Sequence, residues 1–288
     1  MNNRKVGVLG ATSLVGERLI SLMQESAVQV HAFSRKPQAS GSEGLSWNQF
    51  SGIDYSNNDL IEDWLCAAPI WVLQDHFTLL ESYGVRRIVV LSSTSRFTKT
   101  ESPDAGEMAT AARLIQGEER LKTWAACKGV AWVILRPTLI YGNGRDKNIT
   151  EIARFIRRFG FFPLLGEAHG LRQPIHVEDV ARACAEAFKS PAATNRAYNI
   201  SGYETLPYRE MISRVFAALH RSPRLLPIPL AIFSLAVACM RLLPRYKHWS
   251  VAMAERMNSD LVFDHSAAVR DFGFSPRPFQ LSSEDLPQ

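Results

Sequence analysis

The chain has 288 residues, of which 46% are hydrophobic and 21% are charged, and its formal net charge is +5. This composition is that of an ordinary globular protein, and it excludes a disordered, collagen-like or coiled-coil protein. The basic residues are spread along the chain rather than gathered in one segment, which disfavours nucleic acid as a partner. The length allows one large or two small domains with a substantial core.

The four cysteines and the N-terminal residues indicate a reducing compartment. Each cysteine is isolated in an apolar stretch, and no two have the spacing of a metal site or a redox motif. Buried free thiols fit a reducing environment. The residues MNNRK lead directly into a short apolar strand without the hydrophobic region of a secretion signal. We therefore expect a cytoplasmic protein with no metal site.

Short β-branched runs recur along residues 1–202, with helical patterns between them. We expect strands at residues 5–9, 28–33, 87–91, 132–135 and 197–200, one more that ends near Ala67, and one between Leu45 and Asp54. The runs are almost continuously apolar, which is typical of strands that helices cover on both faces. The pattern therefore predicts an α/β fold with a doubly wound parallel sheet.

Helical spacing is clearest at residues 180–188, after Glu178 and Asp179, which are acidic residues suited to a helix start. After Gly202, prolines punctuate helical segments, and we expect no further strand of the sheet. The chain is then divided into a first domain at 1–202 and a smaller, mainly helical C-terminal lobe at 203–288. A short segment of the first domain near 160–172 is expected to extend into this lobe.

The first strand leads into a turn in which Gly10, Ser13 and Gly16 recur every third residue before a helical pattern begins. Such a turn allows backbone N–H groups at the helix start to approach a pyrophosphate, so it predicts a dinucleotide cradle. A purely structural turn is the alternative. Ser13 stands where the middle glycine is expected, and its hydroxyl could crowd a phosphate or bond to it.

The second strand ends in Ser34-Arg35-Lys36 and lacks the acidic residue that would bind a free ribose 2′-hydroxyl. The Arg35 guanidinium and the Ser34 hydroxyl suit a 2′-phosphate instead, which favours NADP over NAD. The alternative is that Arg35 and Lys36 form a solvated loop pair without a ligand.

Four segments carry a resemblance to a known family: GATSLVG at 10–16, LSSTS at 91–95, RPTLIYGNGRD at 136–146 and QPIHVEDVARA at 173–183. Together they resemble the extended or atypical short-chain dehydrogenase/reductase superfamily, in the branch of the nucleoside-diphosphate-sugar epimerases and dehydratases. The resemblance covers about residues 1–202 and implies a Rossmann fold. The turn and the resemblance give these candidate cofactor contacts: Gly10, Thr12, Ser13, Leu14, Val15, Gly16, Ser34, Arg35, Lys36, Asp54, Ala67, Pro69, Ser92, Ser93, Pro137 and Thr138.

The resemblance also implies a catalytic centre, but the chain departs from it. The family relays a proton through a tyrosine and a lysine four residues later on one helix. Aligning Gly117 and Glu118 with that helix puts Thr110 and Leu114 at the two positions, and no tyrosine occurs between Tyr83 and Tyr141. A threonine is far less acidic than a phenol, and leucine carries no charge.

Three residues are candidate catalytic residues: Thr94 beside the substrate, and Lys99 and His176 as substitutes for the missing relay. The resemblance places the hydroxyl of Thr94 beside the substrate carbinol; without it, Thr94 would be an ordinary loop residue. Lys99 follows in the next loop and could reach the site, or it could be solvated. Histidine is a residue type that serves as acid or base in catalysis, so His176 is a candidate for that role, although the matching histidine in the family is usually structural.

Residues 230–240 are apolar and are flanked by Arg241, Arg245 and Lys247. The run is too short to span a membrane, so we expect a buried helix, with contact to a lipid surface as the alternative. We predict an NADP-dependent oxidoreductase or epimerase-like enzyme that acts on a nucleotide sugar or a related carbonyl compound. The alternative is a non-catalytic NADP-binding protein with a redox-sensing or assembly role.

Overall fold

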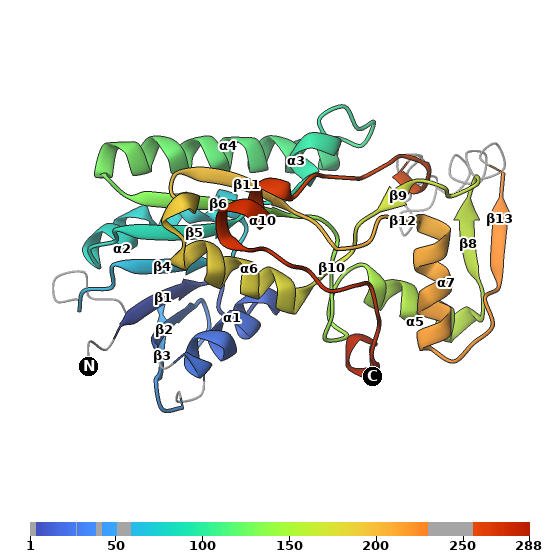
Figure 1. Cartoon of the computed structure of the whole chain (residues 1–288), viewed down its shortest axis with the longest axis horizontal. Coiled ribbons are helices and arrows are strands. Elements are labelled where there is room, and N and C mark those ends of the chain that lie inside the picture. The colour runs from blue at the N-terminus through green and yellow to red at the C-terminus, as the bar shows by residue number, and fades with distance from the viewer. Residues whose placement is uncertain (1–3, 27, 39–41, 51–58, 230–255) are drawn as a thin grey trace.

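The computed structural model describes residues 4–26, 28–38, 42–50, 59–229 and 256–288, and its centre is a seven-stranded sheet (Figure 1). The strand order is β11-β6-β5-β4-β1-β2-β3, so the chain starts in the middle and winds outward in both directions. All neighbouring pairs are parallel, which confirms the predicted doubly wound sheet. The strands are β1 (Lys5–Leu9), β2 (Gln29–Ser34), β3 (Leu45–Gln49), β4 (Asp63–Cys66), β5 (Arg87–Leu91), β6 (Ala131–Pro137) and β11 (Arg196–Ile200).

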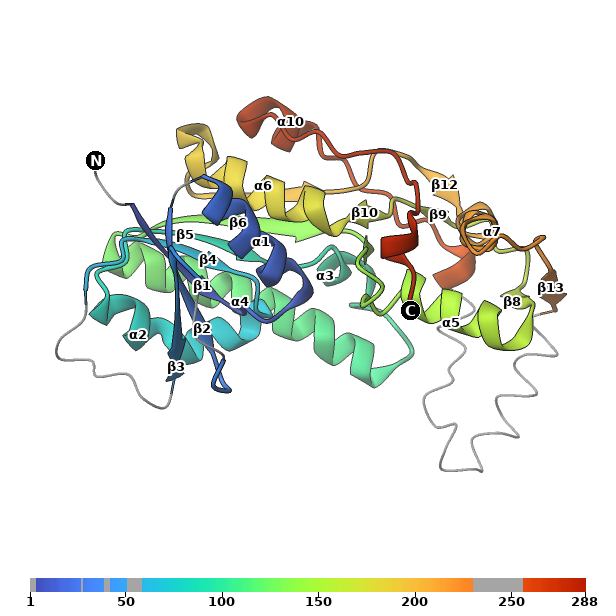
Figure 2. The ribbon, with the colours of Figure 1, turned by 90° about the horizontal axis from the view of Figure 1, so that it is seen from below.

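Helices cover both faces of the sheet, and Figure 2 shows α6 and α10 on one side and α2 and α4 on the other. In β5, Val89 belongs to the core on the α6 side, whereas Ile88 and Val90 belong to the core on the α4 side. Alternate side chains of a strand point to opposite faces, so strands buried on both faces are continuously apolar. The helices are α1 (Leu14–Glu25), α6 (Val177–Lys189) and α10 (Ser266–Phe272) on one face, and η2 (Ile70–His76), α2 (Phe77–Ser82) and α4 (Ala105–Lys128) on the other.

A third group of elements forms a separate apolar core that includes Ile156, Met211 and Phe279. Figure 1 shows these elements at the end of the molecule away from α2 and the amino ends of the strands. They are α5 (Ile149–Phe159), β8 (Phe162–Leu165), α7 (Tyr208–Ala218) and β13 (Leu225–Ile228). The shorter elements are α3 (Ser95–Thr98), β7 (Ile140–Tyr141), β9 (Leu171–Arg172), β10 (Ile175–His176), η3 (Pro191–Ala193), β12 (Leu206–Pro207) and η5 (Ser283–Asp285).

Strands β12 and β13 follow Gly202, where no further strand of the main sheet was expected, and both belong to small sheets instead. β13 has the sequence LLPI and pairs in parallel with β8, with Pro227 opposite Leu164. A proline has no backbone N–H to donate to the hydrogen bonds between strands, so in a sequence it indicates the end of a strand. A strand at the edge of a sheet nevertheless tolerates a proline. The division of the chain at residue 202 stays a prediction: α10 packs against the first core through Ala268 and Phe272.

Several expectations fall on residues outside the described ranges. Residues 230–240, the basic residues that follow them, and Cys239 are among these. The helices of the described ranges include none that is long and apolar enough to cross a membrane. Cys66, Cys127 and Cys184 are free thiols, and within the same ranges no group of three or more His, Cys, Asp or Glu side chains could hold a metal ion.

Candidate functional site

The turn between β1 and α1 brings two backbone segments so close that side chains are excluded at two positions. Gly10 has a φ of +72°, and a Cβ on it would lie 2.4 Å from the backbone nitrogen of Ala68. A Cβ on Gly16 would lie 2.2 Å from the carbonyl oxygen of Gly10. The Oγ of Ser13 caps α1 by accepting from the N–H of Gly16 at 3.0 Å, and it donates to the carbonyl of Ala67 at 3.3 Å. The hydroxyl of Ser13 is thus held by the chain itself.

A first cleft of about 570 Å³ lies beside this turn. Trp71, which the sequence reasoning did not single out, lines it together with part of the predicted cofactor set. Gly10, Thr12 and Gly16 belong to the turn but do not line the cleft, and Asp54 lies outside the described residues. The predicted cofactor contacts that do line it are Ser13, Leu14, Val15, Ala67, Pro69, Ser92, Ser93 and Pro137.

The end of β2 presents two basic side chains to solvent. Arg35 and Lys36 are exposed, and neither forms an ion pair within the described ranges. Ser34 is buried, and its hydroxyl donates to the carbonyl of Lys36. The guanidinium of Arg35 is therefore open to a ligand, whereas the hydroxyl of Ser34 would first have to leave its carbonyl partner.

Helix α4 carries the two residues at the family's relay positions, and both line the first cleft. Thr110 donates its hydroxyl to the carbonyl of Gly106 at 2.8 Å, one turn earlier in the helix. Leu114 is buried, with 4% of its surface exposed. The structure thus places Thr110 and Leu114, the residues aligned with the family's tyrosine and lysine, in the first cleft. Neither side chain can take over the proton relay of that pair.

A second cleft of about 760 Å³ continues from the first. Thr94 and Lys99 line it, as does Thr138 from the predicted cofactor set. The hydroxyl of Thr94 donates to the carbonyl of Pro137 at 3.1 Å, and the Nζ of Lys99 lies 3.4 Å from a carboxylate oxygen of Glu107. The residues that line both clefts, and so make them continuous, are Ser93, Ser95, Ile140, Lys147 and Asn148.

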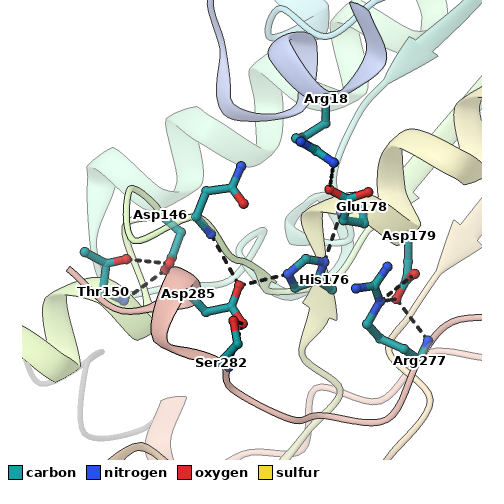
Figure 3. A network of polar contacts seen from close by, with 10 residues as sticks. Arg18, Asp146, Thr150, His176, Glu178, Asp179, Arg277, Ser282 and Asp285 are labelled. Carbon is teal, nitrogen blue, oxygen red and sulfur yellow. Dashed lines mark hydrogen bonds and ion pairs between the residues drawn. The ribbon is translucent and has the colours of Figure 1, made fainter. Parts of the chain in front are cut away.

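His176 lies outside both clefts, at the N-terminus of α6 (Figure 3). Its Nδ1 accepts from the N–H of Glu178 at 3.2 Å, so the ring proton is on Nε2, which donates to Oδ1 of Asp285 at 2.9 Å. Burial alone would raise the pKa of Asp285, but hydrogen bonds from His176 and Ser282 outweigh it and lower this pKa to about 2. The structure therefore gives His176 a capping role and an acidic partner.

The loop at residues 142–148 connects the His176 region to the clefts. Gly142, Asn143 and Gly144 all have positive φ, at 130°, 55° and 58°. Oδ1 of Asp285 accepts from the N–H of Asn143 at 3.4 Å, and a Cβ on Gly144 would lie 2.4 Å from the carbonyl oxygen of Leu286. Residues near 285 thus fix a loop that supplies Lys147 to both clefts.

A buried ion cluster stands behind the first cleft, and sequence reasoning did not find it. The carboxylate of Glu118 is fully buried and accepts hydrogen bonds from Nε and Nη2 of Arg136, at 3.0 and 2.6 Å. Nη1 of Arg96 lies 3.2 Å away, and the hydroxyl of Ser92 donates at 2.7 Å. The sequence signal that could have indicated this cluster is Glu118 itself, an acidic residue among the buried apolar residues of α4. The cluster fixes Ser92, which lines the first cleft.

The basic residues of α5 are placed away from both clefts. Arg154 pairs with Glu151 on the same helix, and Arg157 donates to the carbonyl of Pro287. Arg158 lies over the ring of Phe159, at 5.2 Å from its centroid. None of the three arginines lines either cleft.

Comparisons with known proteins find a family model and several relatives that match parts of this chain. A model of the NAD dependent epimerase/dehydratase family matches residues 76–201. The chain is 27% identical over 157 residues to the mitochondrial NADH dehydrogenase (ubiquinone) 1 alpha subcomplex subunit 9 of Mus musculus, across 54% of this chain and 41% of that protein. It is 26% identical to the 2-alkyl-3-oxoalkanoate reductase of Stenotrophomonas maltophilia, across 68% of this chain and 66% of that protein. The chain therefore spans less than two thirds of the length of these relatives.

Two solved structures show the same fold over nearly the whole chain. MoeE5 in complex with UDP-glucose and NAD has a TM-score of 0.67 at 20% identity, covering 95% of this chain and 94% of that one. UDP-glucuronic acid 4-epimerase from Bacillus cereus in complex with NAD has a TM-score of 0.68 at 15% identity, covering 98% and 93%. The family model matches part of the chain and the solved structures show its fold, and both agree with the resemblance to the extended short-chain dehydrogenase/reductase superfamily that the sequence motifs carry.

Proposed function

We propose that this protein binds NADP(H) and is an oxidoreductase or epimerase-like enzyme for a nucleotide sugar or a related carbonyl compound. One observation carries the proposal: the cleft beside the phosphate cradle opens into a second cleft lined by Thr94, through shared residues that include Ser93. A dinucleotide in the first cleft would therefore meet a substrate in the second. The solved relatives were bound to NAD and, in one case, to UDP-glucose.

The cofactor would be held by the glycine turn and by Arg35, and its nicotinamide would supply hydride transfer. The preference for NADP over NAD rests on the guanidinium of Arg35, since a charge-assisted hydrogen bond is worth about 1.5 to 3 kcal/mol, or roughly ten- to a hundredfold in affinity. The buried free thiols of Cys66 and Cys184 suit a reducing compartment such as the cytoplasm.

Thr94 would polarise the substrate oxygen by donating its hydroxyl hydrogen. To do so, the hydroxyl must turn away from the carbonyl of Pro137. That carbonyl keeps a donor, because the backbone N–H of Thr94 also reaches it at 3.2 Å. Lys99, which lines the same cleft and has Glu107 as its ion-pair partner, is the candidate for the proton. The name of the Stenotrophomonas relative, a 2-alkyl-3-oxoalkanoate reductase, supports a carbonyl substrate.

The test combines cofactor binding with turnover. Calorimetry should show tighter binding of NADP than of NAD, with the difference shrinking in Arg35→Ala; equal affinities in the wild type would refute the preference. Turnover on a panel of nucleotide sugars and ketones should fall in Thr94→Val while cofactor affinity stays the same. Lys99→Met and His176→Ala complete the set. Robust turnover unaffected by all three changes would refute the site.

A second function is favoured by Thr110 and Leu114, which line the first cleft where the family's tyrosine and lysine stand. Positioned acid–base catalysis is worth about 10² to 10⁴ in rate, so without a substitute the protein would bind a dinucleotide and turn over little. It would then have a redox-sensing or assembly role, and one relative is named as a subunit of NADH dehydrogenase. Bound NADP(H) in the purified protein, identified by mass spectrometry, with no turnover on any substrate would favour this function.

A further inference from the structure

The second cleft has two chemically different sides. Towards the sheet, the end of β5 and α3 contribute hydroxyl groups, among them those of Thr94 and Ser95. Towards the far end of the molecule, where Figure 1 places α5, β8 and α7, most of the lining is apolar, and Glu151 of α5 and Tyr208 of α7 are its polar members. Phe155, Phe162 and Met211 come from these three elements. A ligand that fills the cleft therefore meets polar groups at one end and hydrocarbon at the other.

Two buried polar side chains of this cleft, Gln173 and Arg172, already have partners within the chain. Gln173 donates to Thr205 at 3.2 Å and accepts from the N–H of Phe263 at 2.7 Å. The guanidinium of Arg172 donates to the carbonyls of Leu171 and Ser259 at 2.7 and 2.8 Å. Sugar hydroxyls and a nucleobase need partners that are free to bond, because a buried polar group without one is costly. These side chains are poorly prepared for that task.

The charges that line the second cleft are mostly positive. Among the described residues, Lys99, Lys147, Arg172 and Arg256 line it, against the single acid Glu151. Lys99 and Arg256 are both paired with Glu107. Lys147 is exposed and forms no ion pair or hydrogen bond within the described residues, and it lies where the two clefts join. An anionic group is therefore best placed beside Lys147.

We infer that the second cleft takes a carbonyl compound with an anionic head and a long alkyl or acyl chain, rather than a nucleotide sugar. The inference rests on the proposed function and names its substrate class. The carbonyl would lie beside Thr94, the anionic head near Lys147, and the chain against Phe155 and Met211. Each buried methylene is worth about 0.8 kcal/mol, so affinity should rise about fourfold per methylene until the apolar side is covered.

The experiment measures binding of straight-chain 3-oxo carboxylates of increasing length to the protein saturated with oxidised NADP, which cannot reduce them. Calorimetry should show the fourfold rise per methylene, and the longer chains should bind more tightly than UDP-glucose. Phe155→Ser should flatten the dependence on chain length. The matched control is Phe159→Ser on the same helix, since Phe159 is 51% exposed and does not line the cleft. Lys147→Met should weaken all chain lengths by the same factor.

Three results would overturn the inference: an affinity that does not depend on chain length in the wild type, tighter binding of UDP-glucose than of the longest chain, or no binding of the 3-oxo carboxylates at any length. The wild-type series decides the matter even if a variant fails to fold. Binding of NADP is measured first and alone, so its failure would refute the proposed function, whereas NADP binding followed by a preference for UDP-glucose would refute only the substrate class.

Discussion

Replacing Glu118 by glutamine should destabilise the protein strongly, because it leaves two largely buried arginine side chains without their anion. The Glu118 carboxylate has no exposed surface, and the side chains of Arg96 and Arg136 are only 16% and 12% exposed. Removing one partner of a buried ion pair typically costs about 3 to 5 kcal/mol. At about 2 to 4 °C per kcal/mol for a domain of this size, Tm should fall by roughly 6 to 20 °C.

The adjacent residue provides the control. Glu119 is 58% exposed and pairs with Lys122 at 2.8 Å on the surface of the same helix. A surface pair of this kind contributes about 0 to 1 kcal/mol, so Glu119→Gln should change Tm little. Urea unfolding followed by circular dichroism gives the free energy of unfolding of both variants. Equal losses in the two variants, or no loss in Glu118→Gln, would show that the buried cluster does not stabilise the fold as argued.

Three further predictions follow from the turn, the acidic partner of His176 and α4. Gly10→Ala should abolish dinucleotide binding in calorimetry because its Cβ meets backbone, whereas Gly129→Ala, with a φ of +69° and nothing within 4 Å, should retain it. The pKa of Asp285 is lowered from 3.8 to about 2, so the Asp285 carboxylate contributes about 2 kcal/mol to the free energy of unfolding above pH 3.8. This contribution is lost as the pH falls through about 2. In denaturant unfolding, Asp285→Asn should not show this loss. Thr110→Tyr combined with Leu114→Lys should raise turnover by about 10² or more if the missing relay limits it; an unchanged rate would show that another group supplies the proton.

The strands of the sheet were predictable because local sequence determines them. Residues 5–9 and 87–91 were expected as strands and are β1 and β5, since burial on both faces leaves an unbroken apolar run. The glycine turn was equally local, because Gly10 and Gly16 are required by contacts within a few residues and by one neighbouring strand end. β13 escaped notice because Pro227 interrupts its pattern.

The polar networks of the site could not be predicted in the same way. Glu118 meets Arg96 and Arg136 from two other elements, and His176 meets Asp285 across 109 residues of chain. Hydrophobic periodicity tells which side chains are buried, but it does not tell which buried charges become partners. Thr94 was found only because its strand-end motif resembles the family, and Trp71 had no signal of either kind.

The contact between residue 285 and the loop at 142–148 bears on the order in which the molecule folds. The βαβ units of the sheet close through short chain segments, whereas Asn143 and Asp285 are separated by 142 positions. Contacts across such separations form late, because the entropy of closing the long loop is lost before any contact compensates it. A chain with a complete sheet but an undocked segment at 282–286 would therefore be compact and native in secondary structure. In such a chain the loop at 142–148, which supplies Lys147 to both clefts, would not yet be fixed.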